Sequence, residues 1–508
     1  MRFLVYSEVN AANIATSLGK PEYSYYFVLR EFLPVLQQLG EVLVVEFPET
    51  EVDAHYQRAC EAGEDCVFLS FSPPHKTTLG LRCPTIPVFA WEFDSIPTEV
   101  WYDEPEQDWR HGLRLCGRAI VHSQLTVDAV RAAMGEDFPV ISIPAPVWDR
   151  FAAFRALASR AGEPVAVSIQ KGVLMDTLGL SLEPYRPAPD ALERFLAASQ
   201  GESPETSEEL PTPVLQQAPT ESRSLRASVG QVARISLRYL VEWYRLVWRD
   251  VLRVAISGVA PATGGYSTPE EPAPVIEIDH WSPAAHDLCL EGVVFTAVFN
   301  PYDGRKNWMD MLTAFCAAFR EVEDAVLVFK LTHQEYRSAM ESMLMCLGRL
   351  PPFRCRIILL HGYLDEADYH ALLGATAYVV NASHGEGQCL PLMEYLSCGK
   401  PAIAPRNSAM LDYMDEQVGF VVNSWLDGTA WPHDPRLAYR TCRHQLDWSS
   451  LQAAYAEAYR CFHEDPQRYQ QLSANASERM RLHCSQAVAG ERIKRILAME
   501  TSTHANPA

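Results

Sequence analysis

The stretch NASHGEGQCLPLMEYLSCGKPAIAP, residues 381–405, holds two glutamates, Glu386 and Glu394, with seven residues between them. An apolar run of strand length, AYVVNAS, leads into it, and glycines on both sides of Glu386 let the backbone approach a ligand closely. The run LMEYLSCG is typical of a short helix that ends at Gly399, with Pro401 beyond it. The stretch therefore predicts a strand, a glycine-containing loop and a helix. One glutamate precedes the helix and the other lies about one turn into it.

The two glutamates are placed to contact opposite ends of one ligand. Between them lie the backbone amides of residues 387–390. The free N–H groups and the positive dipole end of a helix N-terminus bind phosphate groups, and a carboxylate commonly accepts hydrogen bonds from the ribose hydroxyls of a nucleotide. The alternative is that both carboxylates are solvated surface charges, as most glutamate pairs are. Their position at a strand–loop–helix junction favours a binding site.

The same alternation of apolar strands and helical patterns extends on both sides of this stretch. In residues 286–447 the strand candidates are VVFTAVFN, AVLVFKL, IILLHGYL, AYVVNAS, PAIAP and VGFVVN, and in residues 1–150 they are RFLVYSEV, EVLVVEF, CVFLSF, IPVFAWEF, GRAIVHS and FPVISIPAP. Such strands, mostly apolar on both faces and separated by helices, indicate parallel sheets covered by helices on both sides. The sequence therefore predicts an α/β fold with two doubly wound parallel-sheet domains, whose ligands bind beyond the carboxyl ends of the strands.

Residues 151–285 and 448–499 differ from the two α/β domains. The first segment is expected to be an insertion whose linkers, such as SQGESPETSEELPTPVLQQAPTES, are flexible or disordered because they are rich in Pro, Ser and Glu. The second has a helical pattern throughout, so we expect helices there that pack back across the domains.

One helical pattern in the insertion, residues 222–259, is basic in a chain whose net charge is −21. It has seven arginines and two acidic residues, with most of the arginines in one arc and tryptophans on the apolar face. Amphipathic helices of this kind lie on anionic membrane surfaces. The pattern leaves open whether the helix contacts a membrane, a partner or its own domain.

A second group of polar residues follows the first strand of residues 286–447. In VFNPYDGRKNWMDMLTAF, Arg305 and Lys306 come between the strand and a helix. Two cations at a strand end can neutralise the charge that grows on a leaving diphosphate, a role that a metal ion has in other enzymes. The alternative is a solvated basic cap. Lys330 ends the next strand, AVLVFK, and is expected near the same cleft.

The composition argues against several classes of protein. A net charge of −21 does not suit a general nucleic-acid binder, because binding a polyanion requires a basic surface. The 13 cysteines show no CxxC pair and no zinc-ligand spacing, which indicates reduced thiols in the cytosol. The chain lacks an apolar run of about 18 residues that would span a membrane, and its N-terminal apolar run is too short for a signal peptide. We therefore expect a cytoplasmic protein.

The stretch around the two glutamates resembles the E-x7-E signature of retaining GT-B glycosyltransferases, glycosyltransferase family 4 in particular. The positions that match the family pattern are Ser383, Glu386, Gly387, Pro391, Glu394, Gly399 and Pro401. Cys389 and Tyr395 stand where the family has glycine and alanine. The resemblance covers residues 290–430 well and residues 1–150 in layout. It implies the GT-B fold, in which two Rossmann-like domains face a cleft.

The resemblance also implies roles for the matched residues. Glu386 would contact the donor sugar near the reacting carbon, and Glu394 would hold the ribose hydroxyls. Lys306, with Arg305, would stabilise the leaving diphosphate. The sugar and the diphosphate would lie against Gly387, Gln388, Cys389 and Leu390.

The N-terminal domain matches the family only in layout. By resemblance, the loop NAANIATSLGKPEYS closes over the donor phosphates, with Gly19 as its hinge. His75, Glu92 and Asp94 lie at strand ends that face the cleft. Each of these three either contacts the acceptor or has a structural role.

These observations predict a retaining glycosyltransferase that moves a hexose from a nucleotide-diphosphate sugar to a glycan or a lipid-linked saccharide, as in bacterial surface or extracellular polysaccharide synthesis. The expected enzyme uses no metal ion and no cofactor besides its donor substrate. It would sit at the inner face of the cytoplasmic membrane if the helix at 222–259 binds lipid. Two alternatives stay open: an inactive GT-B donor-binding subunit, which need not keep Glu386, and a GT-B sugar-nucleotide epimerase, which would act without an acceptor.

Overall fold

The computed structural model describes residues 1–10, 13, 22–155, 161–186, 281–432 and 434–499. These residues belong to one compact unit that contains both predicted α/β domains. Gly19, proposed as a hinge, and the helix predicted at 222–259 lie outside the described residues.

The N-terminal domain is built on a parallel sheet whose described strands follow the order β2-β1-β3-β4-β5-β6. The strands are β1 (Arg2–Tyr6), β2 (Glu41–Val44), β3 (Cys66–Phe71), β4 (Thr85–Phe89), β5 (Ala119–Val121) and β6 (Val140–Ser142). The α-helices of this half are α2 (Tyr23–Leu39), α3 (Pro48–Glu61), α4 (Trp109–Cys116), α5 (Gln124–Met134) and α6 (Ala152–Arg155). The strand order reverses between β1 and β3, so the loops that follow these strands diverge there and leave room for a ligand.

The C-terminal domain has parallel strands in the order β10-β9-β8-β11-β12-β13. These are β8 (Ala284–Phe299), β9 (Ala325–Leu331), β10 (Arg356–Gly362), β11 (Thr376–Val380), β12 (Ala402–Pro405) and β13 (Gly419–Val422). Counted from β8, this is the 3-2-1-4-5-6 order of dinucleotide-binding sheets, and the order reverses between β8 and β11. The predicted fold class, two Rossmann-like α/β domains, is therefore confirmed.

One strand of the C-terminal sheet lies within the range predicted to be an insertion. Residues 162–176 form strand β7 (Gly162–Asp176), which pairs antiparallel with β8 and β10. Strand β8 changes partners at Gly292, whose φ of 83° redirects the chain from the antiparallel to the parallel half. The C-terminal sheet is therefore mixed, and it includes residues 162–176 of the segment that the sequence analysis gave to the insertion.

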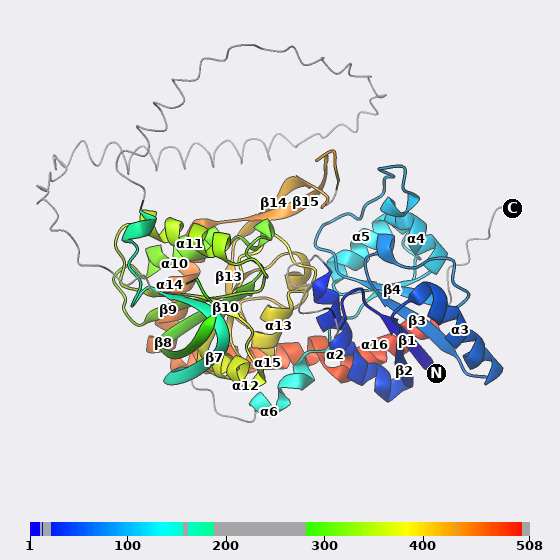
Figure 1. Ribbon diagram of the computed structural model, residues 1–508, viewed down its shortest axis with the longest axis horizontal. Helices are drawn as coiled ribbons and strands as arrows, with labels where there is room; N and C mark the ends of the chain where they lie inside the picture. The colour runs from blue at the N-terminus through cyan, green and yellow to red at the C-terminus, as the bar shows by residue number, and fades with distance from the viewer. Residues whose placement is uncertain (11–12, 14–21, 156–160, 187–280, 433, 500–508) are drawn as a thin grey trace, which may run out of the picture. The chain divides into compact units, whose positions relative to one another are not determined.

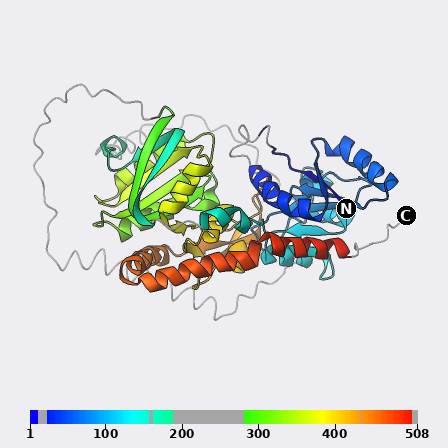
Figure 2. The same ribbon diagram turned by 90° about the horizontal axis from the view of Figure 1, so that it is seen from below.

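The helices of the C-terminal half are α10 (Trp308–Ala318), α11 (Arg337–Arg349), α12 (Glu366–Ala375), α13 (Leu390–Ser397), α14 (Trp448–Glu464), α15 (Pro466–Cys484) and α16 (Gln486–Ala498). The final three helices form a row, coloured orange to red in Figure 2. In that row α15 packs on α13 and α16 packs on α2, so the end of the chain contacts both domains.

Two further strands, β14 (Ser424–Ala430) and β15 (Tyr439–Leu446), form an antiparallel hairpin outside both sheets (Figure 1). No element is predicted for these residues from the sequence, because their pattern is largely polar. In the structure β14 is mostly exposed.

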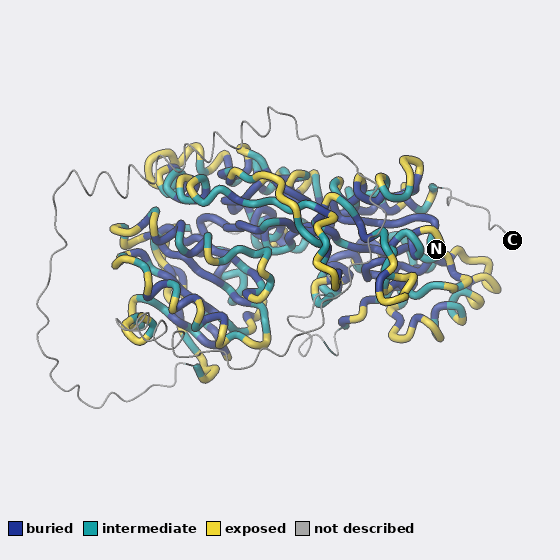
Figure 3. Tube along the Cα trace, turned by 90° about the horizontal axis from the view of Figure 1, so that it is seen from above, coloured by how far each residue is buried: buried dark blue, intermediate teal, exposed yellow. Residues whose placement is uncertain are grey.

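The strands next to each reversal of strand order are deeply buried. Every residue of β3 and of β11 is buried, and Figure 3 shows the sheets in the colour of buried chain. Parallel strands covered on both faces by helices have this pattern, because neither face meets solvent. These rigid strands fix the loops that follow them.

Candidate functional site

The loops after β8 and β11 meet at the point where the strand order of the C-terminal sheet reverses. The first loop carries Arg305 and Lys306 in a short 3-10 helix, Gly304–Lys306, and the second carries Glu386. The two loops are joined by a hydrogen bond from the backbone N–H of His384 to the carbonyl of Arg305, at 2.8 Å. The chain geometry therefore brings together the three residues that the sequence analysis placed at the centre of the site.

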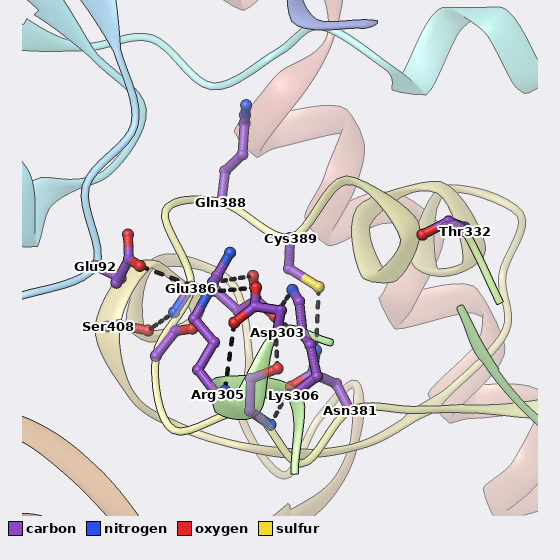
Figure 4. A network of polar contacts seen from close by, with 12 residues as sticks. Glu92, Asp303, Arg305, Lys306, Thr332, Asn381, Glu386, Gln388, Cys389 and Ser408 are labelled. Carbon is purple, nitrogen blue, oxygen red and sulfur yellow. Dashed lines mark hydrogen bonds and ion pairs between the residues drawn. The ribbon is translucent and has the colours of Figure 1, made fainter. Parts of the chain in front are cut away.

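Glu386 is the centre of a network of polar contacts (Figure 4). The residue as a whole is only 2% exposed. Lys306 Nζ lies 2.6 Å from Oε1, and Arg305 Nη1 lies 3.0 Å from Oε2. Ser383 Oγ donates to Oε1 at 2.6 Å, and Asn381 Nδ2 donates at 3.2 Å. The carboxylate is thus held by four donors, two of them cationic.

The charge of Glu386 is fixed by these partners. Burial raises the pKa of its carboxyl group, but Lys306, Arg305 and the Ser383 hydroxyl lower it further, and the resulting pKa is about 2. Glu386 is therefore an anion at neutral pH. It can stabilise positive charge or accept a hydrogen bond from a ligand, but it cannot donate a proton.

Arg305 connects Glu386 to two more carboxylates. Its Nε lies 2.8 Å from Asp303 and 3.5 Å from Glu92, which belongs to the N-terminal domain. Burial raises the pKa of Glu92; Arg305 lowers it, while Glu386 and Asp303 raise it, and the net shift is upward. Glu92 is thus a better proton acceptor than an ordinary surface glutamate.

Two helices begin at the network. Helix α10 follows Lys306 and Asn307, and α13 follows Cys389. Neither of these N-cap residues, both in the described part of the chain, caps its helix with a side-chain hydrogen bond. Each N-terminus therefore adds the positive end of a helix dipole to the site, as expected for an anion-binding position.

The backbone of these loops has positive φ angles at non-glycine residues. Asn307 has a φ of 52°, Cys389 of 60° and Ser408 of 44°, and the Ser408 hydroxyl accepts a hydrogen bond from the backbone N–H of Glu386 at 2.8 Å. Such angles cost energy in residues with a side chain, and they cluster at functional sites. At Cys389 the left-handed backbone is one that glycine adopts without strain, so the cysteine side chain is held there at an energetic cost.

The glycines around Glu386 line the cavity and also allow a close approach of the N-terminal domain. A Cβ on Gly387 would lie 2.7 Å from the Cβ of Ala90, and a Cβ on Gly385 would lie 3.3 Å from the carbonyl of Glu92. Gln388 contacts the same domain, since its Oε1 accepts from the backbone N–H of Ala145 at 3.0 Å. The loop that carries Glu386 is therefore positioned from both domains.

Glu394 lies in α13 and already has two partners. Its Oε1 lies 2.5 Å from Arg150, and its Oε2 accepts a hydrogen bond of 2.5 Å from the hydroxyl of Tyr369. Arg150 also pairs with Glu31 of α2 at 2.5 Å. Glu394, the residue predicted to bind the ribose, is thus oriented by Arg150 and Tyr369. Neither partner could be recognised from the spacing of the two glutamates.

A cavity of about 830 Å³ contains this constellation. Its size suits a small-molecule ligand. The cavity-lining residues from the C-terminal half include Asp303, Arg305, Lys306, Glu386, Gly387, Gln388, Cys389, Leu390 and Glu394, and those from the N-terminal half include Tyr23, His75, Trp91, Glu92 and Trp109. All predicted donor and catalytic residues within the described ranges line this cavity, except Lys330.

Lys330, His75 and Asp94 have different surroundings. Lys330 is not among the described residues that line the cavity; its Nζ donates to the carbonyl of Leu331 at 3.2 Å, and burial lowers its pKa to about 8. His75 lines the cavity and stacks on Trp109. Asp94 accepts hydrogen bonds from the β14–β15 hairpin, which gives it a structural contact.

Within the described ranges, the His, Cys, Asp and Glu side chains form no group of three or more that could hold a metal ion. The helices in the same ranges include none with the length and hydropathy needed to cross a bilayer.

Comparison with known proteins gives matches at the level of structure. No protein-family model and no curated protein sequence matches the chain. Solved structures that are similar include HepE from Anabaena in complex with UDP and glucose, with 12% identity, a TM-score of 0.45, and coverage of 98% of this chain and 99% of that one. A glycosyltransferase from Rickettsia africae has 9% identity, a TM-score of 0.49, and coverage of 98% and 99%. The trehalose-6-phosphate synthase OtsA has 9% identity, a TM-score of 0.49, and coverage of 98% and 100%.

Proposed function

We propose that this chain is a retaining glycosyltransferase that transfers a hexose from a nucleotide-diphosphate sugar to a saccharide hydroxyl without a metal ion. The observation that carries the proposal is the buried carboxylate of Glu386, held by Lys306 and Arg305 where the strand order reverses, in a cavity at the start of two helices. The E-x7-E pattern supports the choice of reaction, and the retention of configuration follows from the resemblance to family 4.

The donor would occupy the cavity with its three parts at three positions. The sugar ring would face Glu386, and the ribose would reach Glu394. The diphosphate would lie between them, at the N-terminus of α13 and near Lys306. An ammonium group has three donors, so Lys306 can keep its 2.6 Å bond to Glu386 and still donate to a phosphate oxygen.

The residues suit a reaction in which positive charge develops on the sugar and negative charge on the leaving group. Glu386, ionised at neutral pH, would stabilise the positively charged sugar carbon. The cations and the helix dipoles would stabilise the departing diphosphate. The proton of the acceptor hydroxyl would pass to a diphosphate oxygen on the same face of the sugar, which preserves the configuration at the reacting carbon.

The acceptor would enter from the N-terminal side of the cavity. Glu92 lines the cavity beside Arg305, and its raised pKa suits a carboxylate that accepts a hydrogen bond from the incoming hydroxyl. His75, stacked on Trp109, offers a flat surface on which a sugar ring can lie. A glycan or lipid-linked saccharide made at the cytoplasmic face of a membrane is the acceptor class that we propose.

Calorimetric titration with a panel of nucleotide sugars tests the donor site. We expect one donor to bind, and we expect Glu394→Ala to weaken its binding by about 1–3 kcal/mol, because a buried hydrogen-bond acceptor is lost. Tyr369→Phe is the matched control, since it removes a hydroxyl from Glu394 and leaves the carboxylate in place. If no nucleotide sugar and no nucleoside diphosphate binds to the wild-type protein, the proposed function is wrong.

A further inference from the structure

The β14–β15 hairpin forms part of the cavity wall beside the loop that carries Glu386. His444 of β15 donates its backbone N–H to the carbonyl of His384 at 2.9 Å, and the carbonyl of His444 is 2.8 Å from Nδ1 of His384. This contact is two residues before Glu386 in the chain. Thr429 from β14 and Arg443 from β15 both line the cavity.

Arg443 differs from the other cations of the cavity because it has no counter-ion. Its buried Nε has no hydrogen-bond partner, and among the described residues no ion pair joins its guanidinium group to a carboxylate, although Asp427 is its cross-strand neighbour in the hairpin. Burial is the main cause that lowers the pKa of His384, and the charge of Arg443 adds to it, so the guanidinium lies near that loop. A buried donor without a partner is costly unless a ligand supplies one.

The other cavity-lining cations are already neutralised. Arg305 lies within 3.5 Å of three carboxylates, those of Glu92, Asp303 and Glu386, and Lys306 pairs with Glu386 as well. Glu394 is neutralised by Arg150. A diphosphate in this cavity would therefore meet Arg305 and Lys306 with their charges already balanced by carboxylates. Among the described residues that line the cavity, Arg443 is the cation whose charge is not balanced in this way.

We propose that Arg443 binds the diphosphate of the nucleotide-sugar donor from the hairpin side of the cavity. The inference rests on the proposed function, since it assigns a further contact within the same donor site. A guanidinium group can donate two parallel hydrogen bonds to phosphate oxygens and keeps its charge at any physiological pH. Arg443 thus supplies positive charge that is not balanced by a carboxylate, whereas the charges of Arg305 and Lys306 are balanced in part by Glu386.

The hairpin that carries Arg443 is held in place by the N-terminal domain. Asp94 Oδ1 accepts hydrogen bonds from the hydroxyl of Thr441, at 2.8 Å, and from the backbone N–H of Cys442, at 2.9 Å. The indole N–H of Trp431, between the two strands, donates to Ser95 Oγ at 3.1 Å. The residues on both sides of Arg443 are therefore anchored, which positions its side chain before a ligand arrives.

Binding measurements with three variants test this proposal. The probes are UDP, GDP and ADP, each compared with its nucleoside. We expect Arg443→Met to weaken binding of the preferred nucleoside diphosphate about 10- to 100-fold, because charge-assisted hydrogen bonds are lost, and to leave nucleoside binding unchanged. The affinity of Arg443→Lys for the nucleoside diphosphate should lie between those of Arg443→Met and wild type. Arg440→Met, on the same strand but outside the cavity and 51% exposed, is the control and should bind as wild type does.

The outcomes separate this inference from the proposed function. Equal diphosphate affinity of wild type and Arg443→Met would overturn the inference alone. A change in only the KM for the acceptor would also overturn the inference alone, since Arg443 would then bind an anionic group of the acceptor and not the donor diphosphate. If wild type binds none of the three diphosphates, the proposed function fails and the inference with it. Thermal unfolding of Arg443→Met should occur at a temperature no lower than that of wild type, because the substitution removes a buried Nε that has no hydrogen-bond partner.

Discussion

Glu386 has a carboxylate with four side-chain donors, and this single group sets the electrostatics of the cavity. Its sequence neighbours indicate a site, but they do not show that Lys306 and Arg305 contact it directly. In the structure the two cations bind the carboxylate, which keeps it ionised at neutral pH. In the proposed function, the same cations would serve both the carboxylate and an incoming phosphate.

The first prediction concerns turnover. Glu386→Gln keeps the shape of the side chain and removes its charge, so stabilisation of the developing positive charge on the sugar is lost. We expect kcat to fall about 100- to 1000-fold, the effect of losing one preorganised electrostatic contact, with donor affinity changed by less than about fivefold. Steady-state kinetics with the best donor measures both values. Glu41→Gln, a surface glutamate paired with Arg2, should leave both unchanged.

The second prediction concerns pH. Because the pKa of Glu386 is about 2 in the folded protein, below its ordinary value of 4.5, the ionised carboxylate stabilises the fold. This contribution is complete above about pH 5 and is lost as the pH falls toward about 2. The difference in unfolding free energy between wild type and Glu386→Gln, measured in urea between pH 6 and pH 3, should shrink on acidification. A difference that is independent of pH would contradict the assigned ionisation.

At the scale of elements, the sequence predicts most strands of both sheets and the helices that separate them, because their apolar runs are buried on both faces. It does not predict β7 or the β14–β15 hairpin. These strands are partly exposed and carry many polar residues, so their pattern resembles that of a loop. Arg443 could not be assigned to the site for the same reason, since no spacing connects it to the two glutamates.

The third prediction concerns the glycine loop. Gly387→Ala places a Cβ 2.7 Å from the Cβ of Ala90, so the loop and the N-terminal domain must separate slightly. We expect a loss of about 1–3 kcal/mol in unfolding free energy, as for other overpacked positions, together with weaker donor binding. Gly374→Ala in helix α12 is the control. Nothing lies within 4 Å of its new Cβ, and the change should stabilise the protein by about 0.5–1 kcal/mol. Chemical denaturation of both variants checks the pair.

Contacts between the two domains converge on the cavity that holds Glu386 and Glu394. Arg150 joins Glu31 of α2 to Glu394 of α13, while Gly387 and Gln388 pack against the N-terminal domain. The sequence could not predict these contacts, because the partners are more than 100 residues apart and no local pattern relates them. The sequence predicts the two domains, and the structure shows which residues form the contacts between them.

The fourth prediction concerns Arg150. Arg150→Met leaves the buried carboxylate of Glu31 and the half-buried carboxylate of Glu394 without their shared cation, which should lower the unfolding free energy by about 2–3 kcal/mol. Arg30→Met, which removes an exposed partner of the same Glu31, should cost at most about 1 kcal/mol. Urea denaturation compares the two variants. Equal losses would show that Arg150 does not connect the domains energetically.

The most direct test of the central claim is the acceptor-dependent release of nucleoside diphosphate from a panel of nucleotide sugars, with cell-envelope glycans and lipid-linked saccharides as acceptors. We predict that the wild-type protein consumes one donor in the presence of an acceptor, and that Glu386→Gln binds this donor but releases diphosphate about 100- to 1000-fold more slowly. If wild type consumes no nucleotide sugar, consumes one equally well without an acceptor, or is no faster than Glu386→Gln, the proposed glycosyltransferase function is wrong.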